Sequence, residues 1–199
     1  MTLDEHRQMT ATTIARSVGA GTDSSANAKR AALCFETALG TCALRWSELG
    51  ISEVVMPGAR APRGSIGADS SAVPESVRAA VAGIVALLEG ERRDLRSIVL
   101  DERRIGSFRR RVYAATRAIA AGATAGYGEI ARAIGAPEEA RAVGTALGEN
   151  PFPIIVPCHR VLAANGALHG FSAPGGIATK RRMLEIECAP GFTQQALFG

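Results

Sequence analysis

The residues that most restrict how this chain can fold are 135–137 (Gly-Ala-Pro), which interrupt a helical pattern that runs from residue 127 to residue 149. Glycine and proline end helices, and proline is well tolerated at the first position of a new one. We therefore predict two short helices, with the second one beginning at Pro137. Residues 138–139 (Glu-Glu) then lie in its first turn, where the helix dipole favours negative charge. This arrangement is a helix-turn-helix.

The second of these helices has two different sides. Helical spacing predicts a buried stripe made of Ala140, Val143, Gly144 and Leu147. The opposite side carries Arg141, Thr145 and Gly148. Small residues let a helix backbone approach the narrow minor groove of DNA, and one long cation can enter the base stack. A surface helix with one salt-bridged arginine is the alternative, and this helix by itself favours it.

The first half of the chain has a different pattern. Residues 1–30 are rich in Thr, Ser, Ala and Gly and are expected to form a flexible leader. Short strand-like runs then precede a helix with Pro74 at its first position and with apolar residues at helical spacing. A further short strand is expected near residue 100. We predict an α/β N-terminal domain over residues 31–100, made of a small antiparallel sheet plus a helix. A mainly α C-terminal domain with the helix-turn-helix follows over residues 101–199.

A third helix, expected within residues 106–122, is rich in arginine. Phe108, Val112, Ala115 and Ile119 fall on one face, and four arginines spread over the others. A core helix with a solvated basic surface is favoured over direct contact with phosphate, because charge runs are common on exposed faces.

Composition narrows the class of protein. The net charge of +4 and the isoelectric point near 9.2 fit an anionic partner such as nucleic acid. The four cysteines lack both C-x-x-C spacing and the density of a secreted disulfide scaffold. The sequence shows neither a signal peptide nor a run of about 18 apolar residues. We expect a soluble cytoplasmic protein, with no metal site because the three histidines have no ligand spacing with the cysteines.

Cys158 stands in the stretch NPFPIIVPCHRVLAANG, which covers residues 150–166, and the apolar residues 154–156 of this stretch are expected to form a buried strand. A buried cysteine that serves as a small apolar residue is one interpretation, and it is favoured for the other three cysteines. The neighbouring His159 and Arg160 favour a reactive thiolate at Cys158 instead. In an extended segment adjacent side chains point to opposite faces, so His159 is expected to act on the sulfur through a water. A carboxylate, Glu185 or Glu187, would then orient the imidazole.

These motifs, PCHRV preceded by NPFPIIV and followed by GFSAPGGIATKRRMLEIE, resemble those of the O6-alkylguanine-DNA alkyltransferases in their stand-alone form. This family is also called the methylated-DNA–protein-cysteine methyltransferases. The resemblance is specific through residues 127–187 and looser in the first half.

The resemblance implies a suicidal repair reaction on double-stranded DNA that contains O6-alkylguanine, with O4-alkylthymine as a second substrate. A monomer without a cofactor would rotate the damaged base out through the minor groove. It would then take the alkyl group irreversibly onto its cysteine. A non-enzymatic lesion-binding protein of the same fold is the alternative, and a cysteine hydrolase is a weaker one because no oxyanion hole is found.

The resemblance also implies a role for each matching residue. Cys158 is the alkyl acceptor, and His159 is the base that acts through a water. Tyr127 donates a proton to guanine, and Arg141 takes the place of the rotated base. Arg160 ties the motif into the fold. Asn150 orders the turn between the recognition helix and the active-site segment and belongs to the substrate pocket, which backbone groups of Val161 and Ser172 also line. The residues that contact DNA beside Arg141 are Ala140, Ala142, Gly144 and Thr145.

The orienting glutamate depends on the alignment. Anchoring on Gly175, Gly176 and Lys180 selects Glu187, whereas counting from Cys158 selects Glu185. Glu187 is chosen because an insertion is better absorbed in the loop with Pro174 than within a helix. Gly126 departs from the family, where a hydroxyl residue is common, and the structural zinc set of some relatives is missing.

Overall fold

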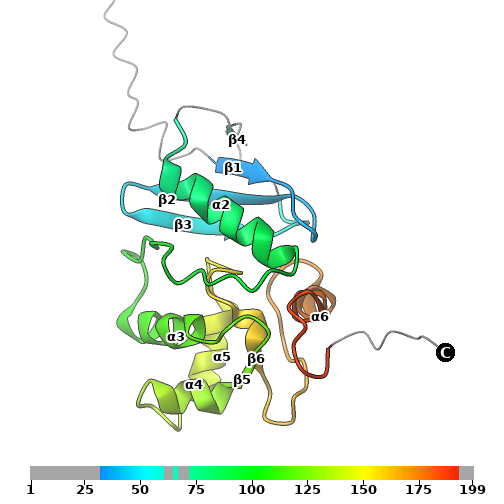
Figure 1. Cartoon of the computed structure of the whole chain (residues 1–199). Helices are drawn as coiled ribbons and strands as arrows, with labels where there is room; N and C mark the ends of the chain where they lie inside the picture. Colours follow the sequence, from blue (N-terminus) through cyan, green and yellow to red (C-terminus); the bar gives the residue numbers. More distant parts are fainter. Residues whose placement is uncertain (1–31, 61–64, 67–71, 193–199) are drawn as a thin grey trace, which may run out of the picture.

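The computed structural model describes residues 32–60, 65–66 and 72–192 (Figure 1). A layer formed by a sheet and one long helix lies above a group of shorter helices that come from the second half of the chain. The leader expected over residues 1–30 lies outside the described residues.

The sheet contains β1 (Ala32–Phe35), β2 (Cys42–Ser47), β3 (Gly50–Val55) and β4 (Ser65–Ile66) in the order β3-β2-β1-β4. The three longer strands pair in antiparallel fashion, as predicted, and the short β4 adds a parallel edge. The strand expected near residue 100 is only a single bridge between Leu100 and Ile51. Two backbone hydrogen bonds hold this bridge, from Ile51 N to Val99 O and from Asp101 N to Ile51 O.

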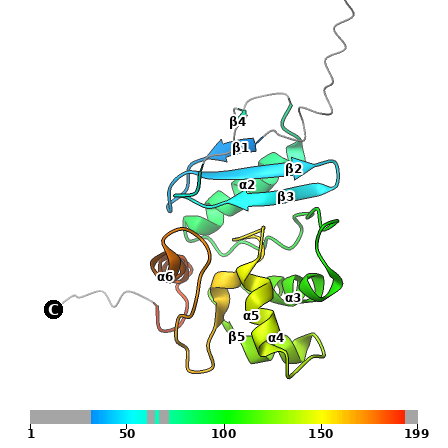
Figure 2. The same ribbon diagram turned by 180° about the vertical axis from the view of Figure 1, so that it is seen from behind.

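The long helix α2 (Glu75–Leu88) lies across one face of the sheet (Figures 1 and 2). Its buried residues are Val77, Ala80, Ile84, Leu87 and Leu88. Pro74 was expected at the first helical position but is the N-cap, with extended backbone angles. The missing N–H of proline costs nothing at either position, so the sequence pattern does not separate them.

The second half contains α3 (Ser107–Arg117), β5 (Ala125–Gly126), α4 (Tyr127–Ala133), α5 (Ala140–Gly148), the 3-10 helix η1 (Cys158–Arg160), β6 (Val161–Leu162) and α6 (Gly176–Ile186). Helices α3, α4 and α5 pack together, and β5 pairs with β6 in parallel. α6 lies to one side of this group (Figure 2).

The start of α5 differs from the prediction. The helix begins at Ala140 and not at Pro137, because residues 134–139 form the turn. Backbone bonds from Ala136 N to Ala131 O and from Glu139 N to Ala136 O close this turn. The predicted buried stripe is also shifted: Val143 and Leu147 are buried with Ala146, while Ala140 and Gly144 are half-buried. The predicted outer side is correct, since Arg141, Thr145 and Gly148 are all exposed.

The arginines of α3 bond to the protein itself. Arg110 donates to Ile105 O and Glu102 O, and Arg111 donates to Ile134 O. Arg117 reaches three backbone carbonyls of residues 95–98, and Arg109 pairs with Glu149. These contacts support the structural interpretation of this helix over phosphate binding.

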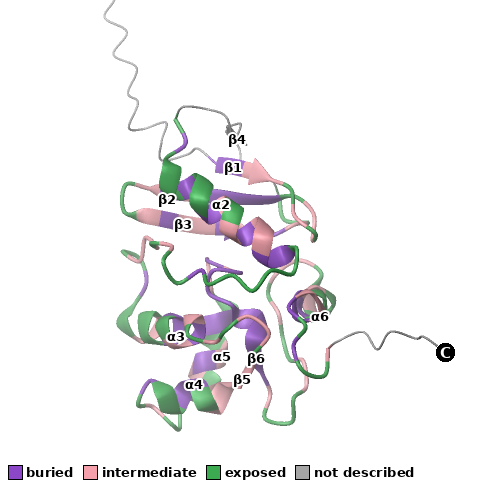
Figure 3. Ribbon diagram, viewed as in Figure 1, coloured by how far each residue is buried: buried purple, intermediate pink, exposed green. Residues whose placement is uncertain are grey.

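One continuous hydrophobic cluster extends from the sheet into the second half (Figure 3). In the lower part Tyr113 meets Phe152 edge to face, and the Tyr113 hydroxyl donates to Ala146 O at 3.1 Å. A backbone hydrogen bond of 2.9 Å from Val54 N to Pro151 O joins the edge of β3 to the segment that precedes Cys158. Within the described residues, no helix combines the length and the apolar character that crossing a membrane requires.

Candidate active site around Cys158

The segment before Cys158 is a buried turn. A strand was predicted over residues 154–156, and this prediction is wrong: the three residues are buried, but Ile154 has a left-handed φ of 74°. Asn150 holds the turn, since its Nδ2 donates to Val156 O at 2.9 Å and its Oδ1 accepts from Phe152 N at 2.9 Å. A short apolar run looks the same in a buried turn as in a buried strand, which explains the error.

Cys158 begins η1, so the extended backbone assumed for residues 158–159 is also wrong. The thiol is buried, and Asn150 Nδ2 donates to its Sγ at 3.4 Å. Burial raises the pKa of Cys158 above its ordinary value, although the Asn150 contact and the charge of Lys180 oppose this. At neutral pH the thiol therefore keeps its proton and needs a base to become a nucleophile.

The carboxylate of Glu187 is the centre of a buried network. His159 Nε2 lies 2.8 Å from Oε1, and Arg160 donates through Nη2 to Oε1 and through Nε to Oε2, both at 2.8 Å. Gly122 N adds a bond of 3.2 Å to Oε2. Burial opposes the charge, but the hydrogen bonds from His159 and Arg160 outweigh it and lower the pKa of Glu187 to about 2.

The structure thus places Glu187, and not Glu185, against His159. Glu185 lies two residues before Glu187, near the end of α6, and makes a long ion pair of 3.8 Å with Arg182, whose side chain is half exposed. This geometry is consistent with the expectation that the loop with Pro174, rather than α6, absorbs an insertion.

The protonation of His159 follows from its surroundings. Because Glu187 is ionised and can only accept, the hydrogen between the two residues must sit on Nε2. Burial lowers the pKa of His159, with Glu187 opposing, so the ring is neutral at pH 7. Nδ1 then has a free lone pair, and it is buried without a hydrogen-bond partner among the described residues. Nδ1 is therefore the one basic atom that this network leaves available.

Two residues near the site were missed as functional candidates. Lys180 is fully buried, and its Nζ donates to Val161 O at 2.7 Å and to His169 O at 3.3 Å. Its position in line with the buried residues Met183 and Leu184 of α6 was a usable signal, because lysine rarely lies on an apolar face without a reason. Gly122 gave no such local signal.

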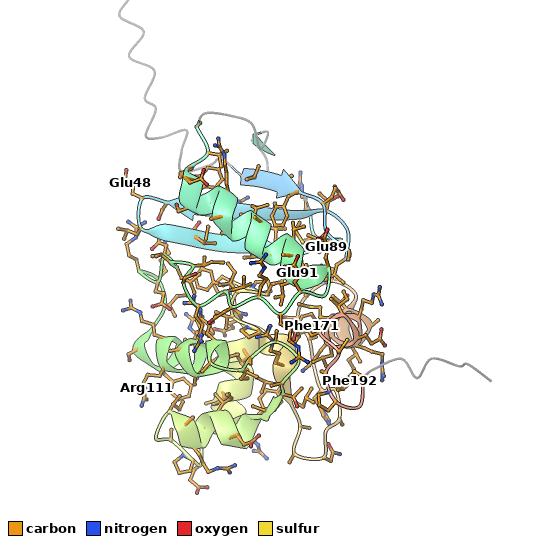
Figure 4. All side chains as sticks on the ribbon, in the orientation of Figure 1. Glu48, Glu89, Glu91, Arg111, Phe171 and Phe192 are labelled. Carbon is orange, nitrogen blue, oxygen red and sulfur yellow. The ribbon has the colours of Figure 1, made fainter. Side chains whose placement is uncertain are left out.

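Cys158 borders two cavities. One, of about 430 Å³, is lined by Tyr127, Gly144, Gly148, His169 and Ser172. The other, of about 210 Å³, lies between the end of β3 and the loop of residues 171–174, with Pro153 on its wall. Phe171 borders both cavities and is labelled beside α6 in Figure 4. Burial raises the pKa of Tyr127, so its hydroxyl stays protonated beside the larger cavity.

A groove of about 840 Å³ runs along α4, α5 and residues 162–166. Its walls are mostly Gly and Ala, and two exposed arginines, Arg132 and Arg141, lie along it. Within the described part of the chain, neither guanidinium has a hydrogen bond or an ion pair. Glu129, which also lines the groove, is bonded to Gly126 N at the start of α4.

Not every residue predicted for the site lies there. Val161 is buried in β6 and does not line either cavity, although its carbonyl receives Lys180. Ala142 is half-buried and does not line the groove, whereas Ala140 and Gly144 do. Thr145 is exposed on α5, and its hydroxyl bonds to Arg141 O. Among the described residues, no group of His, Cys, Asp or Glu could hold a metal ion.

Comparison with known proteins finds relatives whose descriptions agree with one another. The family model described as 6-O-methylguanine DNA methyltransferase, DNA binding domain, matches residues 107–189. A methylated-DNA–protein-cysteine methyltransferase of Mycobacterium tuberculosis is 52% identical over 91 residues, which are 46% of this chain and 54% of the relative. The corresponding protein of Mycolicibacterium paratuberculosis is 47% identical over 115 residues, 57% of this chain and 67% of the relative. The chain thus spans about half to two thirds of these relatives in sequence.

Solved structures cover more of the chain. The crystal structure of Mycobacterium tuberculosis OGT in complex with DNA is 34% identical with a TM-score of 0.63, covering 81% of this chain and 96% of that one. The structure of Mycobacterium tuberculosis O6-methylguanine methyltransferase is 36% identical with a TM-score of 0.64, covering 80% and 94%.

Proposed function

The chain belongs to the O6-methylguanine-DNA methyltransferase family, whose members are also named methylated-DNA–protein-cysteine methyltransferases, and from that premise we propose that it repairs alkylated DNA. It moves the alkyl group of O6-alkylguanine, and of O4-alkylthymine, from duplex DNA to its own Cys158. It acts once, as a cytoplasmic monomer without a cofactor. The observation that carries the proposal is a buried thiol beside a neutral His159 whose free Nδ1 is fixed by Glu187.

The chemical step is an in-line displacement at the alkyl carbon. His159 Nδ1 takes the thiol proton through a water, and Glu187 stabilises the positive charge that forms on the ring. The sulfur then forms a bond to the carbon while the bond from carbon to O6 breaks. Tyr127 supplies a proton so that guanine leaves neutral. Afterwards Tyr127 regains a proton from solvent, and His159 releases to solvent the proton that it took from the thiol. The thioether has no easy leaving step, so no turnover follows.

DNA binding is proposed for the groove along α5. We interpret α4, the turn of residues 134–139 and α5 as a helix-turn-helix whose small residues approach the minor groove. Arg141 enters the base stack in place of the rotated nucleotide, and Arg132 pairs with a backbone phosphate. Residues 101–199 thus form the DNA-binding and alkyl-acceptor domain, and residues 31–100 form the α/β domain that supports it.

Each of the two cavities at Cys158 holds a different part of the substrate. The larger one, of about 430 Å³, has the size of a small-molecule pocket and takes the rotated base. The smaller one, of about 210 Å³, takes the alkyl group. Because both share Cys158, the sulfur lies where base and alkyl group meet. A lesion-binding protein without transfer is disfavoured, since it has no need for a thiol beside a fixed base.

Mass spectrometry of the protein after incubation with duplex DNA that contains O6-methylguanine tests the proposal. We expect one added methyl group per molecule, on the peptide that contains Cys158. Cys158→Ala should abolish transfer and keep binding, and the exposed Cys188 provides a matched control, since Cys188→Ala should transfer normally. Tight binding by the unmodified protein with no gain of mass would refute the proposed transfer.

A further inference from the structure

Gly122 lies in the turn between α3 and β5, far along the chain from the residues it meets. Its backbone N–H donates to Glu187 Oε2 at 3.2 Å, and its φ is 78°. This bond ties the turn to the C-terminal end of α6, where Glu187 is the C-cap. Gly122 therefore touches the carboxylate that holds His159, although it contacts neither the thiol nor either cavity.

A glycine is needed at this position for two reasons. Left-handed backbone is strained for residues with a side chain. In addition, a Cβ built on Gly122 would lie 2.8 Å from the backbone carbonyl oxygen of Glu187, closer than real Cβ contacts. The second restriction is absent at Gly191, which has a φ of 82° and no heavy atom within 4 Å of the same built Cβ. Adding a methyl group at Gly122 must therefore move backbone.

The hydrogen bond from Gly122 gives the carboxylate of Glu187 its fourth donor. Oε1 accepts from His159 and Arg160, and Oε2 accepts from Arg160 and Gly122, so each oxygen has two donors. Donors on both oxygens fix the plane of the carboxylate as well as its position. His159 depends on that plane, because only Oε1 in this orientation receives Nε2–H.

We propose that Gly122 is a positioning residue for alkyl transfer, which holds Glu187 in the orientation that keeps the hydrogen of His159 on Nε2. The role in transfer rests on the proposed function, whereas the effect on His159 does not. A methyl group at residue 122 separates the turn from the end of α6, and Glu187 then leaves its place beside the imidazole. Displacement of a catalytic arrangement by about 1 Å can slow a reaction on the order of 100-fold.

The experiment compares Gly122→Ala with Gly191→Ala, which carries the same backbone strain without the close contact. Gly122→Asn is the second variant, because asparagine tolerates left-handed backbone better and should fold where alanine does not. All are studied as the full chain, below their unfolding temperatures. The first measurement is the single-turnover rate of methyl transfer at saturating DNA. The second is the nitrogen NMR spectrum of the imidazoles, of which the chain has only three.

We expect the Gly122 variants to transfer on the order of 100-fold more slowly at saturating DNA, while Gly191→Ala stays within twofold of the unmodified protein. The His159 signals should show hydrogen on Nε2 alone in the unmodified protein and Gly191→Ala, and a mixture of both tautomers in the Gly122 variants. An unchanged His159 spectrum in a folded Gly122 variant overturns the inference. If the unmodified protein transfers nothing, the proposed function fails, and the spectra still decide the role of Gly122.

Discussion

The network around Glu187 and the groove along α5 differ in whether their charged groups have partners within the protein. At Glu187 the charged groups are buried, and each carboxylate oxygen is matched with two donors from the protein. Along the groove Arg132 and Arg141 are exposed, and within the described residues their guanidinium groups are unmatched. A charged group whose hydrogen bonds are all made within the protein holds its neighbours in a fixed orientation for the reaction. A charged group without such partners is available to bind a ligand. We expect changes at Glu187 to affect stability and rate, and changes in the groove to affect DNA binding.

Removing the charge of Glu187 should have the largest effect. Glu187→Gln keeps the shape but leaves Arg160 buried without a negative partner, and breaking a buried ion pair costs about 3–5 kcal/mol of unfolding free energy. Methyl transfer should also fall on the order of 100-fold, because the amide can present an N–H to His159 and reverse its tautomer. Urea unfolding and single-turnover rates measure the two effects.

Glu185→Gln is the control for that substitution. Its ion pair with Arg182 is 3.8 Å long and partly exposed, so stability should change by less than about 1 kcal/mol and transfer should be normal. Equal losses in the two variants would contradict the distinction between a buried matched charge and a surface charge.

In the unmodified protein, acid should remove the contribution of Glu187 to the free energy of unfolding. Its pKa is about 2 in the folded state and 4.5 ordinarily, so the stabilisation is fully present above pH 4.5 and is lost as the pH falls toward 2. This corresponds to about 3 kcal/mol. Urea unfolding between pH 6 and pH 2.5, compared with Glu187→Gln, should show the stability difference between the two proteins shrink. A difference that stays constant over this range would contradict an ionised Glu187.

In the groove, Arg141→Ala should have a moderate effect on transfer and almost none on folding. Rotating a base out of the stack costs a few kcal/mol, and a loss of about 1.4 kcal/mol of that compensation corresponds to a tenfold slower transfer. Transfer from O6-methylguanine in duplex DNA is the measurement, with thermal unfolding as the check on folding. Equal transfer rates in the two proteins would refute the role of Arg141 as the inserted residue.

Arg132→Gln should have the smallest effect, and salt should reveal it. Loss of one phosphate contact reduces the slope of log affinity against log salt concentration by about 0.9 for duplex DNA. Fluorescence anisotropy at several salt concentrations measures this slope, with Arg182→Gln on α6 as the control. If both variants keep the slope of the unmodified protein, Arg132 does not contact phosphate.

The contrast between the exposed groove and the buried network around Glu187 also explains which features could be predicted from the sequence. The outer side of α5 was predicted correctly because Arg141 and Thr145 follow from local helical spacing. Glu187 was selected by anchoring on Lys180 and two glycines, and the structure places it at His159. The proposed roles of these residues, and the DNA contacts, stay predictions.

Local patterns failed where the geometry is decided by particular hydrogen bonds or by distant contacts, neither of which the residue types reveal. Residues 154–156 are apolar in a turn as they would be in a strand, and only the bonds of Asn150 decide between the two. The helix start at Pro137 fits the local rules, but the preceding turn continues to Glu139. Gly122 contacts a residue far along the chain, so no nearby pattern marks it.

The hydrogen bond from Val54 to Pro151 bears on the order in which the molecule assembles. Helices such as α4 and α5 depend on nearby residues and can form early, whereas contacts between distant segments form slowly. The segment before Cys158 is held by such a contact from β3, and Glu187 joins His159 only when α6 docks. A partly folded molecule therefore carries an ordinary thiol, and we expect reactivity toward DNA to emerge only at the end of folding.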